Sequence, residues 1–401
     1  MAWKEYEIAA MKRALGLAAK GRGFVEPNPM VGAVIVKNRR VVGEGHHHRF
    51  GGPHAETFAL CEASTAARGA EVFVTLEPCS HFGKTPPCAD ALIAAGVKRV
   101  VAAMKDPDER VAGKGFAKLR RAGITVDVGL LEDEARALNA PYVKLRTTRM
   151  PWVIAKYAMT ADGRIATASG ESHWISCEES RRIVHKVRGR MDAIVVGIGT
   201  VLVDDPLLTA RPRGRRLAAR VVMDSKARTP LSSKLVATAA EAPLIIAASK
   251  AAPGPNVEAL KSYSAEVLMV GAGTPDTGGR AVRAGMARDS GSGQGGQERA
   301  PLRNTDDSGR VDAVALVAEL GRRQMTNVLV EGGASVLGSF FAARLVDEVM
   351  VFIAPKLVGE GLAPIEGWMA PGIAGTARLE DFKVARHGCD VMLSGRVRYQ
   401  A

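Results

Sequence analysis

The sequence predicts a two-domain α/β protein, and three observations support this prediction. The chain has 401 residues, which is too long for a single ordinary hydrophobic core. Helix-like and strand-like segments alternate over residues 1–145 and again after residue 148. Between these halves, NAPYVKLRTTRMPWV contains two prolines and little helical periodicity. We therefore predict two domains, residues 1–147 and 148–401.

The first half begins with MAWKEYEIAAMKRALGLAAKGRG, which predicts an amphipathic helix rather than a targeting peptide. A hairpin is expected over residues 28–47, a helix over 56–69 and a strand over 70–79. Cys61 is expected in the core, on the apolar side of that helix. Two helix–glycine–strand units follow, at residues 88–107 and 115–131.

The second half alternates in the same way, with a helix expected around residues 178–189. Strands are expected within residues 152–166, 191–200, 220–225, 243–249, 327–333 and 346–359. Residues 271–310 are rich in Gly, Ser and charge and contain few large apolar residues. Because such a segment buries little apolar surface, we predict a flexible surface insertion there.

Composition narrows the functional class. Lys and Arg exceed Asp and Glu by 55 − 42 = 13, which favours anionic partners such as phosphorylated small molecules, nucleic acid or acidic lipid. No apolar run is long enough for a transmembrane helix, so no membrane partner is expected. Five cysteines in so long a chain argue against a disulfide framework and predict a reducing compartment, the cytoplasm.

A candidate metal site begins at GGPHAETFAL, where a turn leads into a helix. His54, Cys79 and Cys88 supply one imidazole and two thiolates, the ligands of a catalytic zinc that keeps a fourth position for water. Glu56 stands where zinc deaminases, with the pattern H-x-E and P-C-x-x-C, place their proton-transferring glutamate. Taken singly, His54 reads as a helix-start residue and each cysteine as a small buried hydrophobe.

One feature departs from that general pattern, because eight residues separate Cys79 and Cys88 instead of two. The neighbouring His46, His47 and His48 fit a turn at a strand end better than a metal-binding tract, since adjacent side chains point in different directions.

In the second half, VVGIGT and VLVEGGASVLGSFF are apolar strands that run into glycines. Glycines let a backbone approach a phosphate, and a helix N-terminus adds free N–H groups. Neither stretch has the full G-x-G-x-x-G fingerprint, so a Rossmann domain is not predicted.

The stretches HAE, EPCSHFGKTPPCADAL and EPNPMVGAVIV resemble the deaminase half of the bifunctional riboflavin-biosynthesis deaminase/reductases, in which the wide cysteine spacing is usual. DGRIA, ESHWIS, HKVRGRMDAIVVGIGTVLVDDPLLTAR and LVEGGASVLGSFF resemble the reductase half. The resemblance implies a cytidine-deaminase-like three-layer domain followed by a dihydrofolate-reductase-like α/β domain. It covers nearly the whole chain apart from residues 271–310.

The same resemblance implies two activities. The first is zinc-dependent hydrolytic deamination of 2,5-diamino-6-(5-phosphoribosylamino)pyrimidin-4-one. The second is NADPH-dependent reduction of the ribosyl group to ribityl phosphate. A homo-oligomer, a dimer or a tetramer, is also expected.

The resemblance assigns site residues by position. Asn28 would hold the pyrimidine, with the zinc ligands and Glu56 as above. The residues implied for the cofactor are Ala158, Trp174, Thr200, Asp204, Gly333, Ala334, Ser335, Val336, Leu337, Gly338 and Ser339. Those implied for the second substrate are Ser172, Arg188, Leu208, Arg211 and Glu331, of which the arginines suit a phosphate.

Two other functions stay open at this stage. A nucleic-acid deaminase fits the positive charge, but aromatic residues are only 5% and no basic run is interleaved with aromatics that could stack on bases. A deaminase with a non-catalytic second domain fits the sequence MTADG, because the family's usual form is SLDG: Asp162 and Gly163 remain, but Met159 removes a hydroxyl.

Overall fold

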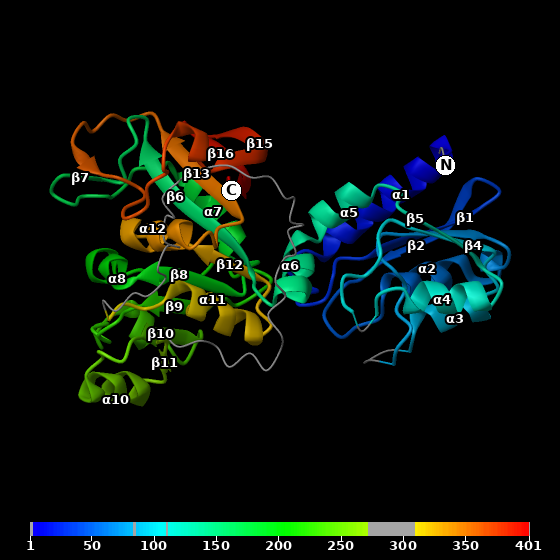
Figure 1. Ribbon diagram of the computed structural model, residues 1–401, viewed down its shortest axis with the longest axis horizontal. Helices are drawn as coiled ribbons and strands as arrows, with labels where there is room; N and C mark the ends of the chain where they lie inside the picture. Colours follow the sequence, from blue (N-terminus) through cyan, green and yellow to red (C-terminus); the bar gives the residue numbers. More distant parts are fainter. Residues whose placement is uncertain (1–2, 83–85, 110, 272–308, 401) are drawn as a thin grey trace, which may run out of the picture.

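The computed structural model describes residues 3–82, 86–109, 111–271 and 309–400, which form two α/β domains side by side (Figure 1). The predicted insertion at residues 271–310 lies almost wholly outside the described residues. No helix among those described is long and apolar enough to cross a membrane.

The first domain is a five-stranded sheet in the order β2-β1-β3-β4-β5. β1 is antiparallel to β2 and β3, whereas β3, β4 and β5 run parallel. The strands are β1 (Gly32–Lys37), β2 (Arg40–His46), β3 (Glu71–Val74), β4 (Arg99–Ala102) and β5 (Thr125–Val128). The helices are α1 (Glu5–Ala18), α2 (Ala55–Ala63), α3 (Cys88–Ala94), α4 (Lys114–Arg121), α5 (Glu132–Leu138) and α6 (Ala140–Thr148), with 3₁₀ turns at Ala19–Gly21 and Ser64–Ala67.

Strand alternation creates two cores, one on each face of this sheet. On β1, Ala33 and Ile35 pack in a cluster with α2, α3 and α4, whereas Val34 and Val36 pack in a cluster with α1, α5 and α6. This sandwich has the three layers that the sequence predicts.

Two expectations about the first domain were wrong. Residues 140–148 form the helix α6, because Pro141 lies in the first turn, where its missing N–H leaves no hydrogen bond unmade. Cys61 is exposed. On α2 the residues Ala55, Ala59 and Ala63 recur every fourth position and face the sheet, so Cys61 points away from it.

The second domain is a nine-stranded sheet in the order β11-β10-β9-β8-β12-β6-β13-β16-β15. The seven strands from β11 to β13 are parallel, and β16 and β15 continue the sheet as an antiparallel edge. The strands are β6 (Trp152–Thr160), β8 (Ala193–Gly197), β9 (Ala219–Met223), β10 (Leu244–Ala248), β11 (Glu266–Met269), β12 (Asn327–Val330), β13 (Glu348–Ala354), β15 (Arg378–His387) and β16 (Asp390–Arg398).

A small separate sheet pairs β7 (Ala166–Thr167) with β14 (Gly361–Leu362). The helices of this domain are α7 (Glu178–Arg188), α8 (Ile198–Asp204), α9 (Lys234–Ala237), α10 (Gly254–Ser262), α11 (Ala313–Arg322) and α12 (Ala334–Ala342), with a 3₁₀ turn at Ile373–Gly375.

The central strands β8, β10 and β12 are buried along their whole length, as the apolar runs of the sequence predict. Side chains from α11 and α12 pack on one face, and those from α9 and α10 pack on the other. Because the parallel strands all end at the same edge, the residues that follow β6, β8 and β12 are brought together there.

The two domains meet around α6 (Figure 1). Lys144 donates to Asp347 over 2.5 Å, and Arg146 donates to Gln324 over 3.1 Å. Arg216 forms ion pairs with Glu26 of the first domain and with Asp192 of the second. Hydrogen bonds and ion pairs therefore link the two domains at this junction.

Candidate active sites

The first site lies where three segments of the first domain converge. His54 is the N-cap of α2, Cys79 follows β3, and Cys88 is the first residue of α3. His54 Nδ1 lies 3.2 Å from Cys88 Sγ and 3.5 Å from Cys79 Sγ, and the three ligand atoms lie within 4.8 Å of one another. The structure thus gathers the three predicted metal ligands, one of which comes 34 residues after the first.

These distances fit zinc. Bond lengths of about 2.0 Å to nitrogen and about 2.3 Å to sulfur, at tetrahedral angles, separate the nitrogen and sulfur atoms by about 3.5 Å. A hydrogen bond from Cys88 lowers the pKa of Cys79, against the effect of burial, and His54 lowers it further. The cluster therefore favours a thiolate, which is the form that binds a metal.

Glu56 lies one helical step inside α2 and is 3% exposed. Its Oε2 atom is buried and has no hydrogen-bond partner among the described residues. Burial raises the pKa of this carboxyl group, opposed by His54. A buried carboxylate with an unused oxygen beside a metal-ligand set is suited to take up and release a proton.

Glu56 faces a cavity of about 490 Å³ that opens next to the ligand cluster. The cavity is lined by Asn28, Pro29, Val31, His47, Phe50, Gly51, Gly52, His54, Glu56, Leu76, Glu77, Cys79, His81, Asp106, Asp108, Val111, Tyr142 and Arg146. Its size suits a small-molecule substrate.

His47 is a wall residue that the sequence interpretation missed. The histidine tract was predicted to be a turn after a strand, and β2 does end at His46. His47, however, is buried and donates from Nδ1 to the Pro53 carbonyl over 3.0 Å. Its Nε2 is therefore the acceptor for Asn28 Nδ2, 3.3 Å away, and this bond orients the Asn28 amide toward the cavity.

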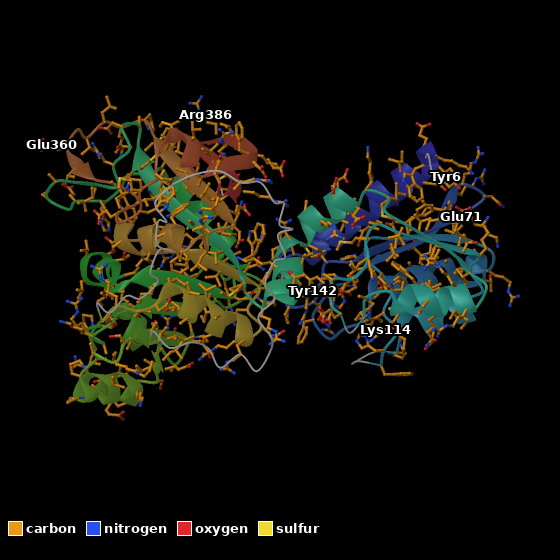
Figure 2. All side chains as sticks on the ribbon, viewed as in Figure 1. Tyr6, Glu71, Lys114, Tyr142, Glu360 and Arg386 are labelled. Carbon is orange, nitrogen blue, oxygen red and sulfur yellow. The ribbon has the colours of Figure 1, made fainter. Side chains whose placement is uncertain are left out.

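Asp106 and Tyr142 were also missed. Tyr142, labelled on α6 at the domain junction in Figure 2, donates to Asp106 Oδ1 over 3.0 Å. Burial raises the pKa of Asp106 to about 6. The helix that the sequence interpretation overlooked thus supplies part of this cavity wall.

The second site lies at the carboxyl ends of β6, β8 and β12. Glu331 directly follows β12, and its side chain is 4% exposed. Arg188, the last residue of α7, binds it with two hydrogen bonds, 2.5 Å from Nε to Oε1 and 2.9 Å from Nη2 to Oε2. Burial opposes ionisation of Glu331, but Arg188 and Lys156 together lower its pKa to about 2.

Two residues near this pair were assigned no role from the sequence. Lys156 Nζ lies 3.7 Å from Glu331 Oε2, and burial lowers the pKa of this lysine. His185 accepts a hydrogen bond from the Arg211 backbone over 3.2 Å. Arg188 and Glu331 are therefore paired, and Arg211 contacts His185 on the helix that ends at Arg188. The three predicted substrate residues thus lie near one another.

Two glycines lie at the starts of helices next to the Arg188–Glu331 pair. Gly197 is the N-cap of α8 and Gly333 the N-cap of α12. A methyl group on Gly197 would lie 2.8 Å from Val336 Cγ2, and one on Gly333 would lie 3.6 Å from the Thr200 hydroxyl. Two strand-to-helix turns that approach this closely, with a hydroxyl between them, fit the phosphates of a dinucleotide.

The remaining predicted residues lie around this edge. Ala158 is on β6, Ser172 donates to Asp204 over 3.4 Å, and Trp174 is 62% exposed with Arg181 stacked 4.5 Å from its ring. Leu208 is 2% exposed and packs in the core, so any contact it makes with a ligand comes from its backbone.

Along α12, only part of the predicted cofactor segment faces outward. Ser335 is exposed and the side chain of Ser339 donates to the Val336 carbonyl. The buried members of the segment are Ala334, Val336, Leu337 and Gly338. Met159 packs against the core of the sheet. The next residue, Thr160, donates to Asp162 Oδ1 over 2.5 Å and so provides a hydroxyl in this turn.

A cluster of three residues that could hold a metal, beside a buried carboxylate suited to proton transfer, is the arrangement of a zinc deaminase, and the turns of the second domain could hold the phosphates of a dinucleotide. Comparison with known proteins agrees with both assignments. Residues 4–104 match the family model for the cytidine and deoxycytidylate deaminase zinc-binding region, and residues 151–393 match that for the RibD C-terminal domain.

Relatives match over nearly the full length. The riboflavin biosynthesis protein RibD of Aquifex aeolicus is 40% identical over 90% of each chain, and that of Escherichia coli is 39% identical over 96% of this chain and 97% of its own. The structure of RibD from Acinetobacter baumannii superposes with a TM-score of 0.79 at 33% identity, over 98% of this chain and 99% of its own. The chain therefore belongs to the RibD family.

Membership fixes the broad function. The chain is a bifunctional deaminase and reductase of riboflavin biosynthesis, with a zinc-binding deaminase domain and a reductase domain that uses NADPH. The predicted cytidine-deaminase-like and dihydrofolate-reductase-like folds are confirmed.

Proposed function

We propose that the first site hydrolytically deaminates 2,5-diamino-6-(5-phosphoribosylamino)pyrimidin-4-one. The second site then reduces the ribosyl group of the resulting aminouracil to ribityl phosphate. A Thermotoga maritima protein described as a diaminohydroxyphosphoribosylaminopyrimidine deaminase/5-amino-6-(5-phosphoribosylamino)uracil reductase supports this assignment. It is 33% identical over 98% of this chain and 99% of its own, with a TM-score of 0.75.

The observation that carries the first activity is the unpartnered Glu56 oxygen beside the gathered His54, Cys79 and Cys88. We assign these three residues as zinc ligands. Zinc, when bound, makes a coordinated water acidic enough to react near neutral pH. Glu56 takes one proton from the water and delivers it to the ring nitrogen, and it then takes the second proton from the added hydroxyl and delivers it to the leaving amine, so that one water is consumed and one ammonia is released.

Asn28 holds the pyrimidine in this proposal. Its amide is fixed by the acceptor Nε2 of His47, so the Asn28 oxygen stays free to accept from an exocyclic amine. The buried position of His47 lowers its pKa, which keeps the ring neutral and able to accept.

The second activity rests on the charged group at the strand ends. Arg188, Arg211 and Glu331 bind the substrate together with Ser172 and the Leu208 backbone. NADPH, when bound, supplies the hydride. We assign the cofactor to Ala158, Trp174, Thr200, Asp204 and the segment from Gly333 to Ser339. Because both Glu331 oxygens accept from Arg188, a ribosyl hydroxyl competes with that ion pair for the same acceptor.

We further propose that the deaminase unit comprises residues 1–147 and the reductase unit residues 148–401. The first sheet draws its strands from residues 32–128 and the second from residues 152–398, which supports this division. The sparse cysteines support a cytoplasmic location. A homo-oligomer, a dimer or a tetramer, completes the proposal.

The test starts from the diaminopyrimidine substrate and full-length, zinc-loaded enzyme. Ammonia release and NADPH oxidation are measured together, and the expected result is one NADPH oxidised for each ammonia released, with a lag before oxidation. NADPH oxidation without ammonia would contradict the proposed order. Ammonia release without NADPH oxidation would show that the second domain does not reduce the proposed substrate.

A further inference from the structure

Two cysteines outside the zinc cluster lie together in the second domain. Cys177 is the N-cap of α7, and Cys389 lies in the two-residue turn between β15 and β16. Their Sγ atoms and a carboxylate oxygen of Asp390 lie within 4.8 Å of one another, although 212 positions separate the two cysteines in the sequence. Figure 2 labels Arg386, close to this hairpin end, at the outer edge of the domain.

The backbone around the pair is fixed by hydrogen bonds. The Cys177 N–H donates to Asp390 Oδ2 over 2.8 Å, and the Cys177 thiol donates to the His387 carbonyl over 3.0 Å. A methyl group on Gly388 would lie 3.0 Å from Cys177 Sγ. The start of α7 and the hairpin turn are therefore in contact, so a bond between the sulfur atoms needs side-chain rotation and not a rearrangement of the fold.

We infer that Cys177 and Cys389 form a reversible dithiol–disulfide couple. Cys389 is exposed, so it is the thiol that a peroxide reaches first. Its sulfur attacks the peroxide and becomes a sulfenic acid, releasing one water. Cys177 then attacks that sulfur, the S–O bond breaks, the S–S bond forms, and a second water leaves with the Cys177 proton.

A metal site is the competing interpretation of the same cluster. Asp390 Oδ2 accepts from the Cys177 N–H, and Oδ1 accepts from the Cys389 thiol over 3.5 Å. Both carboxylate oxygens and both thiols are thus hydrogen-bonded, as the three proposed ligands of the zinc site also are, so the zinc content of the protein decides between the two interpretations.

The disulfide would join the β15–β16 hairpin to the segment before α7, which contains residues of the proposed reductase site. Cys177 ends the segment that contains Ser172 and Trp174. The Trp174 carbonyl already accepts from Lys356 over 2.5 Å. Oxidation would therefore fix the end of this segment to the β15–β16 hairpin and close a loop of more than 200 residues.

The experiment uses the full, zinc-loaded chain treated with hydrogen peroxide, alkylated, and digested without reduction for mass spectrometry. The expected product is a peptide pair linked through Cys177 and Cys389, with the loss of two alkylatable thiols and full recovery after dithiothreitol. The unfolding midpoint of the second domain should rise by about 5 °C on oxidation.

Three variants make the result specific. Cys177→Ser and Cys389→Ser should each abolish the linked peptide, and serine is a favourable N-cap, so the first variant should fold. Cys61→Ser is the matched control, because Cys61 is exposed but is not part of either cysteine cluster, and it should leave the linked peptide unchanged.

Two results would overturn the inference. One is that both thiols stay fully alkylatable after peroxide, or that Cys389 links only to a second chain. The other is a reduced protein with two zinc ions per chain that falls to one in Cys389→Ser, which would identify the cluster as a metal site.

Discussion

The two active sites both contain a buried glutamate, but they balance its charge in opposite ways. Glu331 gives both oxygens to Arg188 and lies 3.7 Å from Lys156, so its charge is balanced within the chain. Glu56 has an oxygen without a partner among the described residues, next to the three proposed zinc ligands. The comparison teaches that the second site is electrostatically complete, whereas the first depends on metal, water and substrate.

The largest expected effect comes from Glu56→Gln. Because this variant removes the proton carrier, deamination should fall by roughly 10²–10⁴-fold. Zinc content, the stability of the fold and NADPH oxidation with the deaminated substrate should stay unchanged. Ammonia release, zinc analysis and NADPH absorbance check these outcomes. Deamination within threefold of the unmodified enzyme would show that another group moves the proton.

Arg188→Met tests the second site, in which the charge of Glu331 is balanced within the chain. It leaves Glu331 buried with only the more distant Lys156, so the free energy of unfolding of the second domain should fall by about 3 kcal/mol and reduction should be lost. The double variant Arg188→Met/Glu331→Gln should recover most of the stability but not the activity. Denaturant unfolding and NADPH oxidation measure the two effects.

Lys186→Met is the matched control, because Lys186 is an exposed cation on the same helix. Its cost should stay below about 0.5 kcal/mol. Equal destabilisation by the two single variants would mean that the Arg188–Glu331 pair contributes nothing beyond a surface charge.

Asp106 lies in the wall of the first cavity, and its ionisation is expected to make the free energy of unfolding depend on pH. Its pKa is raised by burial to about 6, from 3.8 when exposed. Ionisation therefore costs more in the folded state, and the stability present below pH 3.8 is lost as the pH rises through 6. Asp106→Asn should be more stable than the unmodified protein at pH 7 by up to about 3 kcal/mol, at about 1.4 kcal/mol per pH unit.

This difference should disappear near pH 4, and denaturant unfolding from pH 4 to pH 7 measures it. Asparagine keeps the oxygen that accepts from Tyr142, so the variant isolates the charge. A variant that is less stable than the unmodified protein at pH 7 would show that the carboxylate is stabilised when ionised.

The smallest effect is expected for Cys61→Ser. Because Cys61 is exposed on α2, the free energy of unfolding should change by less than about 0.5 kcal/mol. A loss of 2 kcal/mol or more would restore the sequence-based expectation that this residue is part of the core.

The contrast between the sites also explains what could be predicted from the sequence. His54, Glu56, Cys79 and Cys88 are rare residue types at spacings that chemistry restricts, so the first site could be recognised from short motifs. The alternating strands and helices of both domains were predictable for a similar reason, since each core face has a period of two or about 3.6 residues.

The remaining residues carry no such local signal. Lys156 and His185 reach the second site because the sheet places β6 and β12 next to α7. His185 begins a stretch that resembles the reductase half, but nothing in that stretch singles out this residue. Tyr142 was not predicted to line the first site because helix α6 was not predicted. Pro141 was interpreted as a helix breaker, whereas it lies in the first turn of this helix. Cys61 was wrongly predicted to be in the core. The residues of α2 that face the sheet are alanines, which are less hydrophobic than cysteine, so the sequence favoured the side of the helix that contains Cys61.

The central claim is that one chain contains two sites that work independently, and one measurement tests it most directly. Chelated, zinc-free enzyme is given the deaminated aminouracil ribosylamino phosphate with NADPH, and NADPH oxidation is followed. We expect an undiminished rate of NADPH oxidation, while deamination of the diaminopyrimidine is abolished and returns with added zinc. Oxidation that stops with zinc removal and recovers with zinc would contradict the independence of the second site.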